Sequence, residues 1–159
     1  MNIRVGFGFD VHQLSEGEEL WIGGVKVPSE KGAVGHSDAD VLIHAICDAL
    51  LGAANLKDIG YHFPDTSPEY KGISSLKILE KVCELIKEQG YFVNNIDTTI
   101  CLEEPKISPF IRQMKEKLAT ASCLESDDIS IKATTTEKIG FTGRKEGIAA
   151  YCSALIKKN

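Results

Sequence analysis

The stretch GFGFDVHQLSEG, from Gly6 to Gly17, places a carboxylate and an imidazole two residues apart at the end of an apolar run. Residues 3–9 have the composition of a strand. In an extended chain, residues i and i+2 point to the same side, so Asp10 and His12 are able to converge on one point. Such a pair suits a metal ion or a proton in transit, although a lone D-x-H pair is also common without either role.

A helix is predicted to follow within residues 35–56, GHSDADVLIHAICDALLGAANL, because its apolar residues recur at helical spacing. Ser37 or Asp38 is expected to cap it. His44 lies on the flank of the apolar stripe, and a helix packed on the first strand would bring it to Asp10 and His12. Two imidazoles and one carboxylate with an open fourth position are typical of catalytic zinc. A helical histidine is more often a surface or core residue, so this alternative stays open.

The remaining chain predicts a sheet with helices packed on it, in one domain over residues 1–159. Gly90 is expected to cap the second helix, and Ser108 to cap the third. The Gly-, Pro- and Asp-rich segment 57–72 is predicted to be a functional loop. The other expected elements are a hairpin at 19–32, helices at 73–90 and 108–122, and strands at 91–103 and 129–136. The last segment, 146–158, fits a strand or a helix, and the alternation of Ile148, Ala150, Cys152 and Ala154 favours a strand.

Composition excludes several classes of protein. The 159 residues are 43% hydrophobic and 26% charged, which is ordinary for a globular domain, and the net charge of -5 argues against nucleic-acid binding. No apolar run has the roughly 18 to 20 residues that a membrane span requires. The five cysteines form no CxxC pair and no leader segment is evident. We therefore expect reduced thiols and a cytoplasmic protein.

Two further segments have the chemistry of phosphate binding. His36 and Ser37 precede a helix N-terminus, where free N–H groups favour anions. Residues 132–147, KATTTEKIGFTGRKEG, combine hydroxyls, glycines, Arg144 and a carboxylate, Glu137, that could hold Mg²⁺. Helix capping and a glycine turn explain the same residues without a ligand.

The segments GFDVHQL, IGGVKVP, GHSDADVLIHAICDALLGAANLKDIGYHFPDT and KATTTEKIGFTGRKEGI together resemble the family of 2-C-methyl-D-erythritol 2,4-cyclodiphosphate synthases. The resemblance runs from about Ile3 to Ile156. It implies an α+β fold whose mixed sheet is covered on one side by helices. It also implies a homotrimer with the sheets facing the three-fold axis and active sites between subunits.

The reaction implied by the resemblance belongs to non-mevalonate isoprenoid biosynthesis. The 2-phosphate of 4-diphosphocytidyl-2-C-methyl-D-erythritol 2-phosphate attacks the β-phosphate, which yields the cyclic diphosphate and CMP, so the enzyme is a phosphorus–oxygen lyase. By the same resemblance, Asp10, His12 and His44 hold Zn²⁺. Glu137 binds a second ion, Mg²⁺ or Mn²⁺, and His36 and Thr135 stabilise the transition state.

The resemblance also assigns substrate contacts. Residues 102–108 and 133–135 would form a cytidine pocket supplied by the adjoining subunit. Here Leu102 and Glu103 replace the usual Ala-Gln, which leaves the side-chain contacts of that strand open. The full set of implied substrate-binding residues is Asp10, His12, His36, Ser37, Asp58, Ile59, Gly60, Phe63, Pro64, Asp65, Thr66, Ser67, Leu102, Lys106, Ile107, Ser108, Ala133, Thr134, Thr135, Thr136, Glu137, Phe141 and Arg144.

Two rival functions use the same residues. A metal-dependent phosphohydrolase would split a nucleotide diphosphate with a metal-bound hydroxide and release a linear phosphate. A trimeric binding protein with structural zinc would hold small terpenoid phosphates without turnover. The products of the reaction, or their absence, separate these functions.

Overall fold

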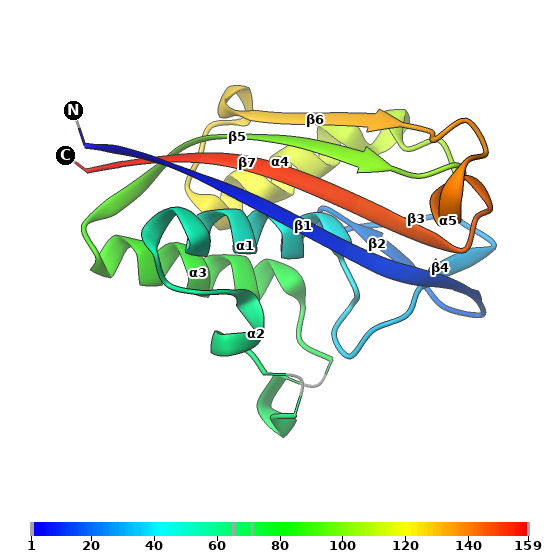
Figure 1. Cartoon of the computed structure of the whole chain (residues 1–159), viewed down its shortest axis with the longest axis horizontal. Helices are drawn as coiled ribbons and strands as arrows, with labels where there is room; N and C mark the ends of the chain where they lie inside the picture. Colours follow the sequence, from blue (N-terminus) through cyan, green and yellow to red (C-terminus); the bar gives the residue numbers. More distant parts are fainter. Residues whose placement is uncertain (1, 65, 71, 159) are drawn as a thin grey trace.

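The computed structural model describes residues 2–64, 66–70 and 72–158. Seven strands and five α-helices lie in this part of the chain (Figure 1). Short 3-10 turns occupy Pro68–Tyr70, Ser108–Phe110 and Ser126–Asp128. In chain order the elements are β1 (Ile3–Glu16), β2 (Leu20–Ile22), β3 (Val25–Val27), β4 (Lys31–Ala33), α1 (Val41–Ala54), α2 (Ile59–His62), α3 (Ser75–Glu88), β5 (Tyr91–Cys101), α4 (Ile111–Ser122), β6 (Ile129–Thr134), α5 (Gly140–Gly143) and β7 (Gly147–Lys158).

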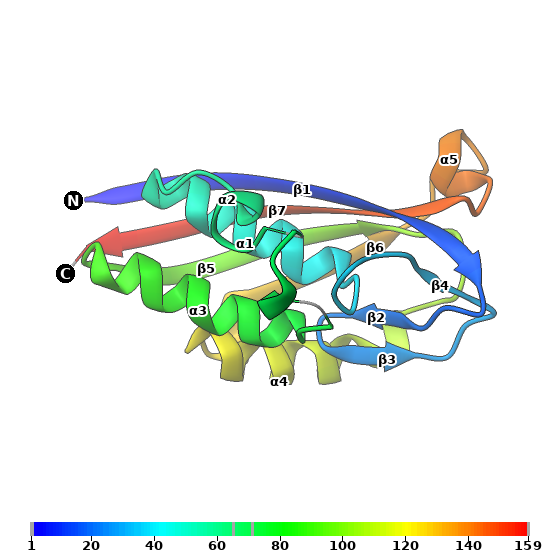
Figure 2. The same cartoon turned by 90° about the horizontal axis from the view of Figure 1, so that it is seen from below.

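The main sheet has the strand order β4-β1-β7-β5-β6 within the described residues. Strand β7 pairs antiparallel with both β1 and β5, whereas β5 and β6 are parallel, so the sheet is mixed. Helices α1, α3 and α4 lie on one side of it (Figure 1 and Figure 2). Strands β2 and β3 form the predicted hairpin. The predicted α+β class and the helix-covered sheet are confirmed.

Strand β1 is longer than predicted. Its pairing with β7 continues to Gln13 opposite Gly147, so the D-x-H pair lies inside the strand. Asp10 and His12 interrupt the apolar alternation because their side chains face a cavity, not the closed core. Alternation in β7 follows the prediction: Ile148, Ala150, Cys152 and Ala154 are all buried on the helix side.

Two glycines allow helix α1 to lie directly on β1. A Cβ atom on Gly6 would stand 1.8 Å from the carbonyl oxygen of Ala49, and one on Gly8 would stand 1.9 Å from that of Ala45. Any side chain at either position would therefore push the helix away from the strand. This close approach sets the distance from His44, on the helix, to Asp10 and His12, on the strand.

Two predicted helix caps are wrong. The N-cap of α1 is Asp40, whose carboxylate accepts from the Ile43 N–H, and not Ser37 or Asp38. Ser108 lies within a 3-10 turn that begins after Ile107, so it caps no helix. The predicted glycine at the end of α3 is confirmed: Gly90 follows the C-cap Gln89 with a φ of 78°, and its N–H donates to the Lys87 carbonyl at 2.8 Å.

The segment 57–72 is less irregular than predicted, because it contains α2 and the 3-10 turn at Pro68–Tyr70. Asp65, one of the predicted substrate contacts, lies outside the described residues. All five cysteines are free thiols, as predicted. None of the described helices combines the length and apolar character needed to cross a membrane.

The face of the sheet opposite the helices carries an exposed apolar patch along β1 and β7. Val5 is 70% exposed and Phe7 is 66% exposed, and Phe9, Val11 and Tyr151 continue the patch along β1 and β7. The ring centroids of Phe9 and Tyr151 lie 5.0 Å apart. We call these five residues the open-face patch.

Candidate metal centre and active site

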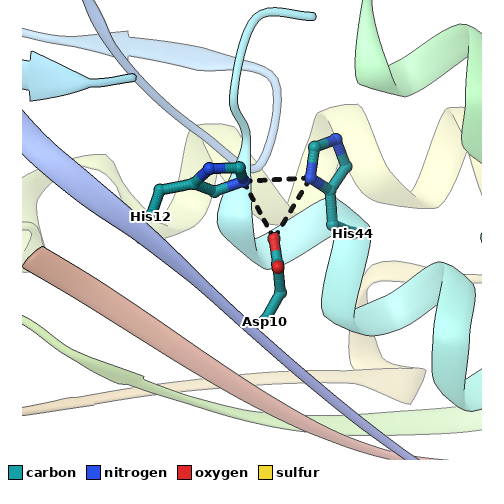
Figure 3. A group of neighbouring side chains, drawn as sticks. All are labelled: Asp10, His12 and His44. Carbon is teal, nitrogen blue, oxygen red and sulfur yellow. Dashed lines mark hydrogen bonds and ion pairs between the residues drawn. The ribbon is translucent and has the colours of Figure 1, made fainter. Parts of the chain in front are cut away.

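Asp10, His12 and His44 converge at one point between strand β1 and helix α1 (Figure 3). The Oδ2 atom of Asp10 lies 3.0 Å from Nε2 of His12 and 3.1 Å from Nδ1 of His44. The two ring nitrogens are 3.2 Å apart. Three donor atoms therefore form a nearly equilateral triangle, and we call these residues the triad.

The triad fits a tetrahedral metal ion. Zinc bonds to nitrogen and oxygen ligands are about 2.0 to 2.2 Å long, which places neighbouring ligands of a tetrahedral site roughly 3.3 Å apart. The observed separations of 3.0 to 3.2 Å approach that value. Imidazole and carboxylate donors suit a borderline cation such as Zn²⁺. The group can hold one metal ion and leave one coordination position open.

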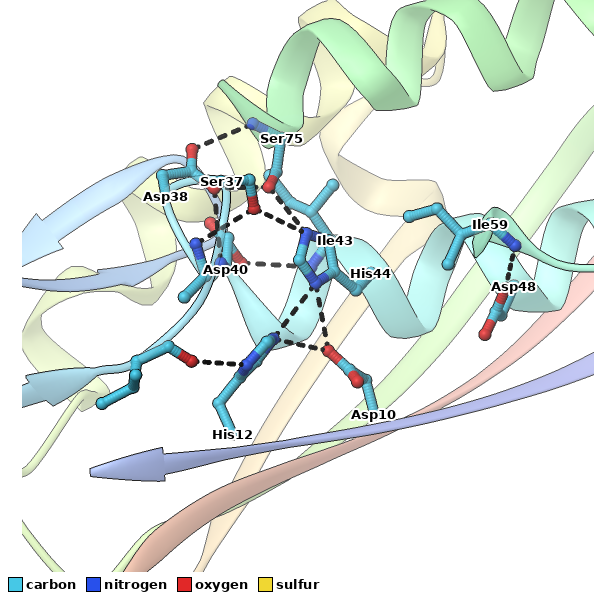
Figure 4. Close-up of polar contacts among 12 residues, drawn as sticks. Asp10, His12, Ser37, Asp38, Asp40, Ile43, His44, Asp48, Ile59 and Ser75 are labelled. Atoms are coloured by element: carbon cyan, nitrogen blue, oxygen red, sulfur yellow. Dashed lines mark hydrogen bonds and ion pairs between the residues drawn. The ribbon is translucent and has the colours of Figure 1, made fainter. Parts of the chain in front are cut away.

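Hydrogen bonds on the outer side of each ring orient the two imidazoles. Nδ1 of His12 lies 3.1 Å from the carbonyl oxygen of Val34, which can only accept, so this nitrogen carries the proton and Nε2 faces the triad with a lone pair. Nε2 of His44 lies 3.0 Å from the hydroxyl of Ser75 and 3.3 Å from that of Ser37 (Figure 4). Outer partners of this kind are typical of metal-binding histidines.

The electrostatics of the triad favour a charged carboxylate. Burial by itself would raise the pKa of Asp10, but the hydrogen bonds and charges of His12 and His44 outweigh it and lower the pKa from 3.8 to about 2. Burial opposes the charged form of His44, yet the Asp10 carboxylate raises the pKa of this imidazole above 6.5. The negative charge of Asp10 thus favours a positive charge within the triad, whether a proton on His44 or a metal ion.

Two further carboxylates, one at the N-cap of helix α1 and one within it, support the site. Asp40 is fully buried, and it accepts from the backbone N–H groups of Gly23 and Gly24 at 2.9 and 2.7 Å. Burial raises the pKa of Asp40 despite these bonds. Asp48 accepts from the Ile59 N–H at 2.7 Å and so ties α2 to α1. Both carboxylates fix neighbouring backbone in place beside the triad.

A cavity of about 740 Å³ opens beside the triad, which is large enough for a nucleotide-sized ligand. It is lined by nine of the predicted substrate-binding residues: Asp10, His12, His36, Ser37, Ile59, Gly60, Phe63, Thr66 and Ser67. Val34, Gly35, Pro68, Tyr70, Ile73 and Ile78 also line it. The sequence analysis missed these six because most of them offer only backbone atoms or apolar side chains, which carry no motif.

The other predicted substrate-binding residues that the structure describes do not line this cavity. Asp58 lies beside it and caps α2, and its carboxylate accepts from the Tyr61 N–H at 2.9 Å. Among the described residues, the triad is the only group of three or more His, Cys, Asp or Glu side chains close enough to hold a metal ion, and Glu137 is not part of it. Outside the cavity lie Asp58, Pro64, Leu102, Lys106, Ile107, Ser108, Ala133, Thr134, Thr135, Thr136, Glu137, Phe141 and Arg144.

Most of the residues outside the cavity belong to the segments around the ends of β5 and β6 and the α5 turn (Figure 1). The Leu102 N–H donates to the Thr134 carbonyl at 3.0 Å, which joins the two predicted cytidine segments. The side chains of Leu102 and Ile107 are buried, so these residues offer only backbone groups to a ligand. Arg144 forms a bidentate ion pair with Glu146 at 3.0 Å.

Ser75 is a site residue that the sequence analysis missed. It is fully buried, and its hydroxyl contacts both His44 and the carboxylate of Asp38. Its only sequence signal is a place near the start of a helix, which most serines there share without touching a site.

Comparison with known proteins places the chain in a family. The sequence matches the model of the YgbB family over residues 3–157. A 2-C-methyl-D-erythritol 2,4-cyclodiphosphate synthase of Bacteroides thetaiotaomicron is 62% identical over 159 residues, which cover 100% of both chains. The synthase of Porphyromonas gingivalis is 63% identical over 153 residues, which cover 96% of this chain and 94% of the relative.

Solved structures of related proteins have the same fold as this chain. The bifunctional IspDF from Campylobacter jejuni has a TM-score of 0.95 at 41% identity; the match covers 99% of this chain but only 42% of that longer protein. A 2C-methyl-D-erythritol-2,4-cyclodiphosphate synthase in a form bound to CDP has a TM-score of 0.90 at 33% identity, over 97% of this chain and 100% of the other. The chain therefore belongs to the YgbB family, and its relatives from Bacteroides thetaiotaomicron and Porphyromonas gingivalis are named 2-C-methyl-D-erythritol 2,4-cyclodiphosphate synthases.

Proposed function

We propose that this protein converts 4-diphosphocytidyl-2-C-methyl-D-erythritol 2-phosphate into 2-C-methyl-D-erythritol 2,4-cyclodiphosphate and CMP. The observation that carries the proposal is the triad of Asp10, His12 and His44 on the wall of a 740 Å³ cavity, in a chain of this family. The relative solved with CDP supports a cytidine nucleotide as the ligand. The activity is that of a phosphorus–oxygen lyase of the non-mevalonate isoprenoid route.

The three residues of the triad would hold Zn²⁺. When bound, such an ion supplies Lewis-acid stabilisation to a phosphate oxygen. Glu137 is the proposed ligand of Mg²⁺ or Mn²⁺. Because Mg²⁺ is commonly held by one or two carboxylates together with substrate phosphates, a single exposed glutamate is compatible with that role.

The chain's own residues would fix the geometry of the reaction. An oxygen of the 2-phosphate attacks the β-phosphorus, the bond from that phosphorus to the bridging oxygen breaks, and CMP leaves with the bridging oxygen. Both reacting groups belong to one molecule, so a cavity that holds them in line removes most of the entropic cost. His36 and Ser37 lie on the cavity wall and are proposed to contact the phosphates, with Thr135 as a further stabilising residue.

We propose a homotrimer with active sites between subunits. Two features support it. The open-face patch is an apolar surface of the kind that mediates association, and it would face the three-fold axis. The predicted site residues also fall into two groups on one chain, so a neighbouring subunit would bring residues 102–108 and 133–135 to the cavity. A single synthase domain over residues 1–159 and a cytoplasmic location complete the proposal.

Product analysis tests this function. The protein is incubated with the cytidylyl substrate and Mg²⁺, and the products are followed by phosphorus NMR. We expect resonances of a cyclic diphosphate and of CMP in equal amounts. A linear phosphate would instead identify a phosphohydrolase, and binding without any product would identify a binding protein; either result contradicts the proposal.

A further inference from the structure

A chain of hydrogen bonds connects His44 to a carboxylate on the far side of the ring from the triad. Ser75 is the first residue of α3 and is fully buried. Its hydroxyl lies 3.0 Å from Nε2 of His44 and also contacts the carboxylate of Asp38, and its backbone N–H donates to the same carboxylate at 2.9 Å (Figure 4). These contacts are separate from the three contacts that the triad residues make with one another.

The chemistry of the partners sets the direction of every bond in this chain. An ionised carboxylate can only accept, so the Ser75 hydroxyl donates to Asp38. Because the hydroxyl proton of Ser75 is donated to Asp38, the Ser75 oxygen can only accept from His44. The ring of His44 therefore carries its proton on Nε2. Nδ1 is then left with a lone pair that points at Asp10 and His12. The hydroxyl of Ser37 is farther away, at 3.3 Å, and already accepts from the Ala39 N–H.

The same carboxylate also caps helix α3. Ser74 occupies the N-cap position but forms no capping bond with its side chain. Asp38 takes over that function from a different part of the chain, because it satisfies the first backbone N–H of α3 and places a negative charge at the helix N-terminus. The start of α3, which follows the cavity-lining Ile73, is thereby fixed to the segment that precedes α1.

We propose that Asp38 and Ser75 are positioning residues that hold the ring of His44 with its Nδ1 lone pair directed at the cation. This inference rests on the proposed metal site and adds two residues that are neither ligands of the cation nor part of the cavity lining. Outer partners of metal-binding histidines contribute about 10- to 100-fold to metal affinity. We expect an effect of that size from either residue.

Zinc affinity provides the first test. Metal-free protein is titrated with zinc in competition with a chromophoric chelator, and the folded state of each variant is checked by circular dichroism. Ser75→Ala is expected to weaken zinc binding by about 10- to 100-fold. Asp38→Asn is expected to do the same, since an amide N–H facing Ser75 would turn the hydroxyl toward His44 and reverse the chain.

Ser122→Ala is the matched control. Ser122 is also a buried serine on a helix, but its hydroxyl donates only to the Leu118 carbonyl of α4, at 2.6 Å. This variant removes a hydroxyl and a local bond without touching the metal site. We expect it to bind zinc as the unaltered protein does.

Nitrogen NMR of the zinc-loaded protein gives a readout that a merely structural role would not change. We expect the Nε2 proton of His44 to give a slowly exchanging resonance in the unaltered protein and in Ser122→Ala, and to exchange much faster in Ser75→Ala. Unchanged zinc affinity together with an unchanged resonance in Ser75→Ala would overturn the inference. If Ser75→Ala does not fold, the test uses Asp38→Asn instead. Unchanged zinc affinity in that variant, together with a fast-exchanging Nε2 proton of His44 in the unaltered protein, would overturn the inference.

The outcome is separable from that of the proposed function. If the protein binds zinc and shows these differences but yields no cyclic diphosphate, the role of the positioning residues is supported and the proposed reaction is rejected. If the protein is an active synthase and its variants bind zinc equally well, the reaction is supported and the role of the positioning residues is rejected. A protein that binds no zinc would overturn both.

Discussion

Nε2 of His12 and Nδ1 of His44 lie 3.2 Å apart, although 32 positions separate the two residues in the sequence. Two like lone pairs at this distance repel unless a proton or a cation lies between them. The strand and the helix that carry them are held together by a glycine contact rather than by the ring nitrogens. The fold thus imposes the donor cluster, and a cation relieves its repulsion.

The glycine contact predicts a coupled loss of stability and metal binding in Gly8→Ala. The new Cβ would stand 1.9 Å from the Ala45 carbonyl, so α1 must move away from β1. We expect a loss of roughly 1 to 3 kcal/mol in the free energy of unfolding, measured in urea, together with weaker zinc binding. Gly52→Ala, a helical position with open space around it, should instead be stabilising by about 0.5 to 1 kcal/mol. A Gly8→Ala protein with unaltered zinc affinity would show that the contact does not position His44.

The metal-free protein should have a pH optimum of stability set by Asp10 and His44. The pKa of Asp10 is lowered from 3.8 to about 2, so its contribution is present above 3.8 and disappears as the pH falls toward 2. The pKa of His44 is raised above 6.5, so its contribution is complete below 6.5 and disappears as the pH rises through the folded value. Urea unfolding should therefore show the largest contribution between pH 3.8 and 6.5. His44→Asn should flatten the alkaline side of the profile, and an equally steep decline in that variant would contradict the assignment.

The second cation is tested by Glu137→Gln. Glu137 is exposed, so the substitution should change the free energy of unfolding by no more than about 0.5 kcal/mol and should leave zinc content unchanged. We expect the variant to need a higher Mg²⁺ concentration for half-maximal turnover. A magnesium titration that superimposes on that of the unaltered protein would remove Glu137 from the metal-binding residues.

The open-face patch is tested by a charge. Phe7→Glu places a carboxylate on a side chain that is 66% exposed in the single chain and would be buried at the proposed three-fold axis. We expect sedimentation velocity to report a trimer for the unaltered protein and smaller species for the variant, with turnover lost and zinc binding retained. Tyr61→Glu, an exposed aromatic on α2 away from this face, should leave the trimer intact. A fully active Phe7→Glu monomer would rule out sites between subunits.

Local patterns were sufficient to predict the parts of the site that one element controls. The period of a strand places Asp10 beside His12, and the period of a helix places His44 on its inner flank. The main strands and helices follow the same rules, although β1 is longer than predicted, the caps of α1 and α4 differ, and the short elements β4, α2 and α5 were not predicted.

Contacts between elements could not be predicted in the same way. Asp40 takes the cap of α1 because two backbone amides of the β2–β3 hairpin meet its carboxylate, and no motif near Asp40 encodes that hairpin. Asp38 and Ser75 meet across 37 positions for the same reason. Glu137 illustrates a further limit, because it joins no group of three metal-binding side chains within the described residues, and its predicted role depends on the phosphates of a substrate.

The most direct measurement combines metal content with turnover in the unaltered protein and in His44→Ala. Zinc is removed with a chelator and restored, the bound metal is counted per chain, and the cyclic product is followed by phosphorus NMR. We predict one zinc per chain, no turnover without it, recovery when it is restored, and neither zinc nor turnover in a folded His44→Ala protein. Full production of the cyclic diphosphate by metal-free His44→Ala would contradict the account.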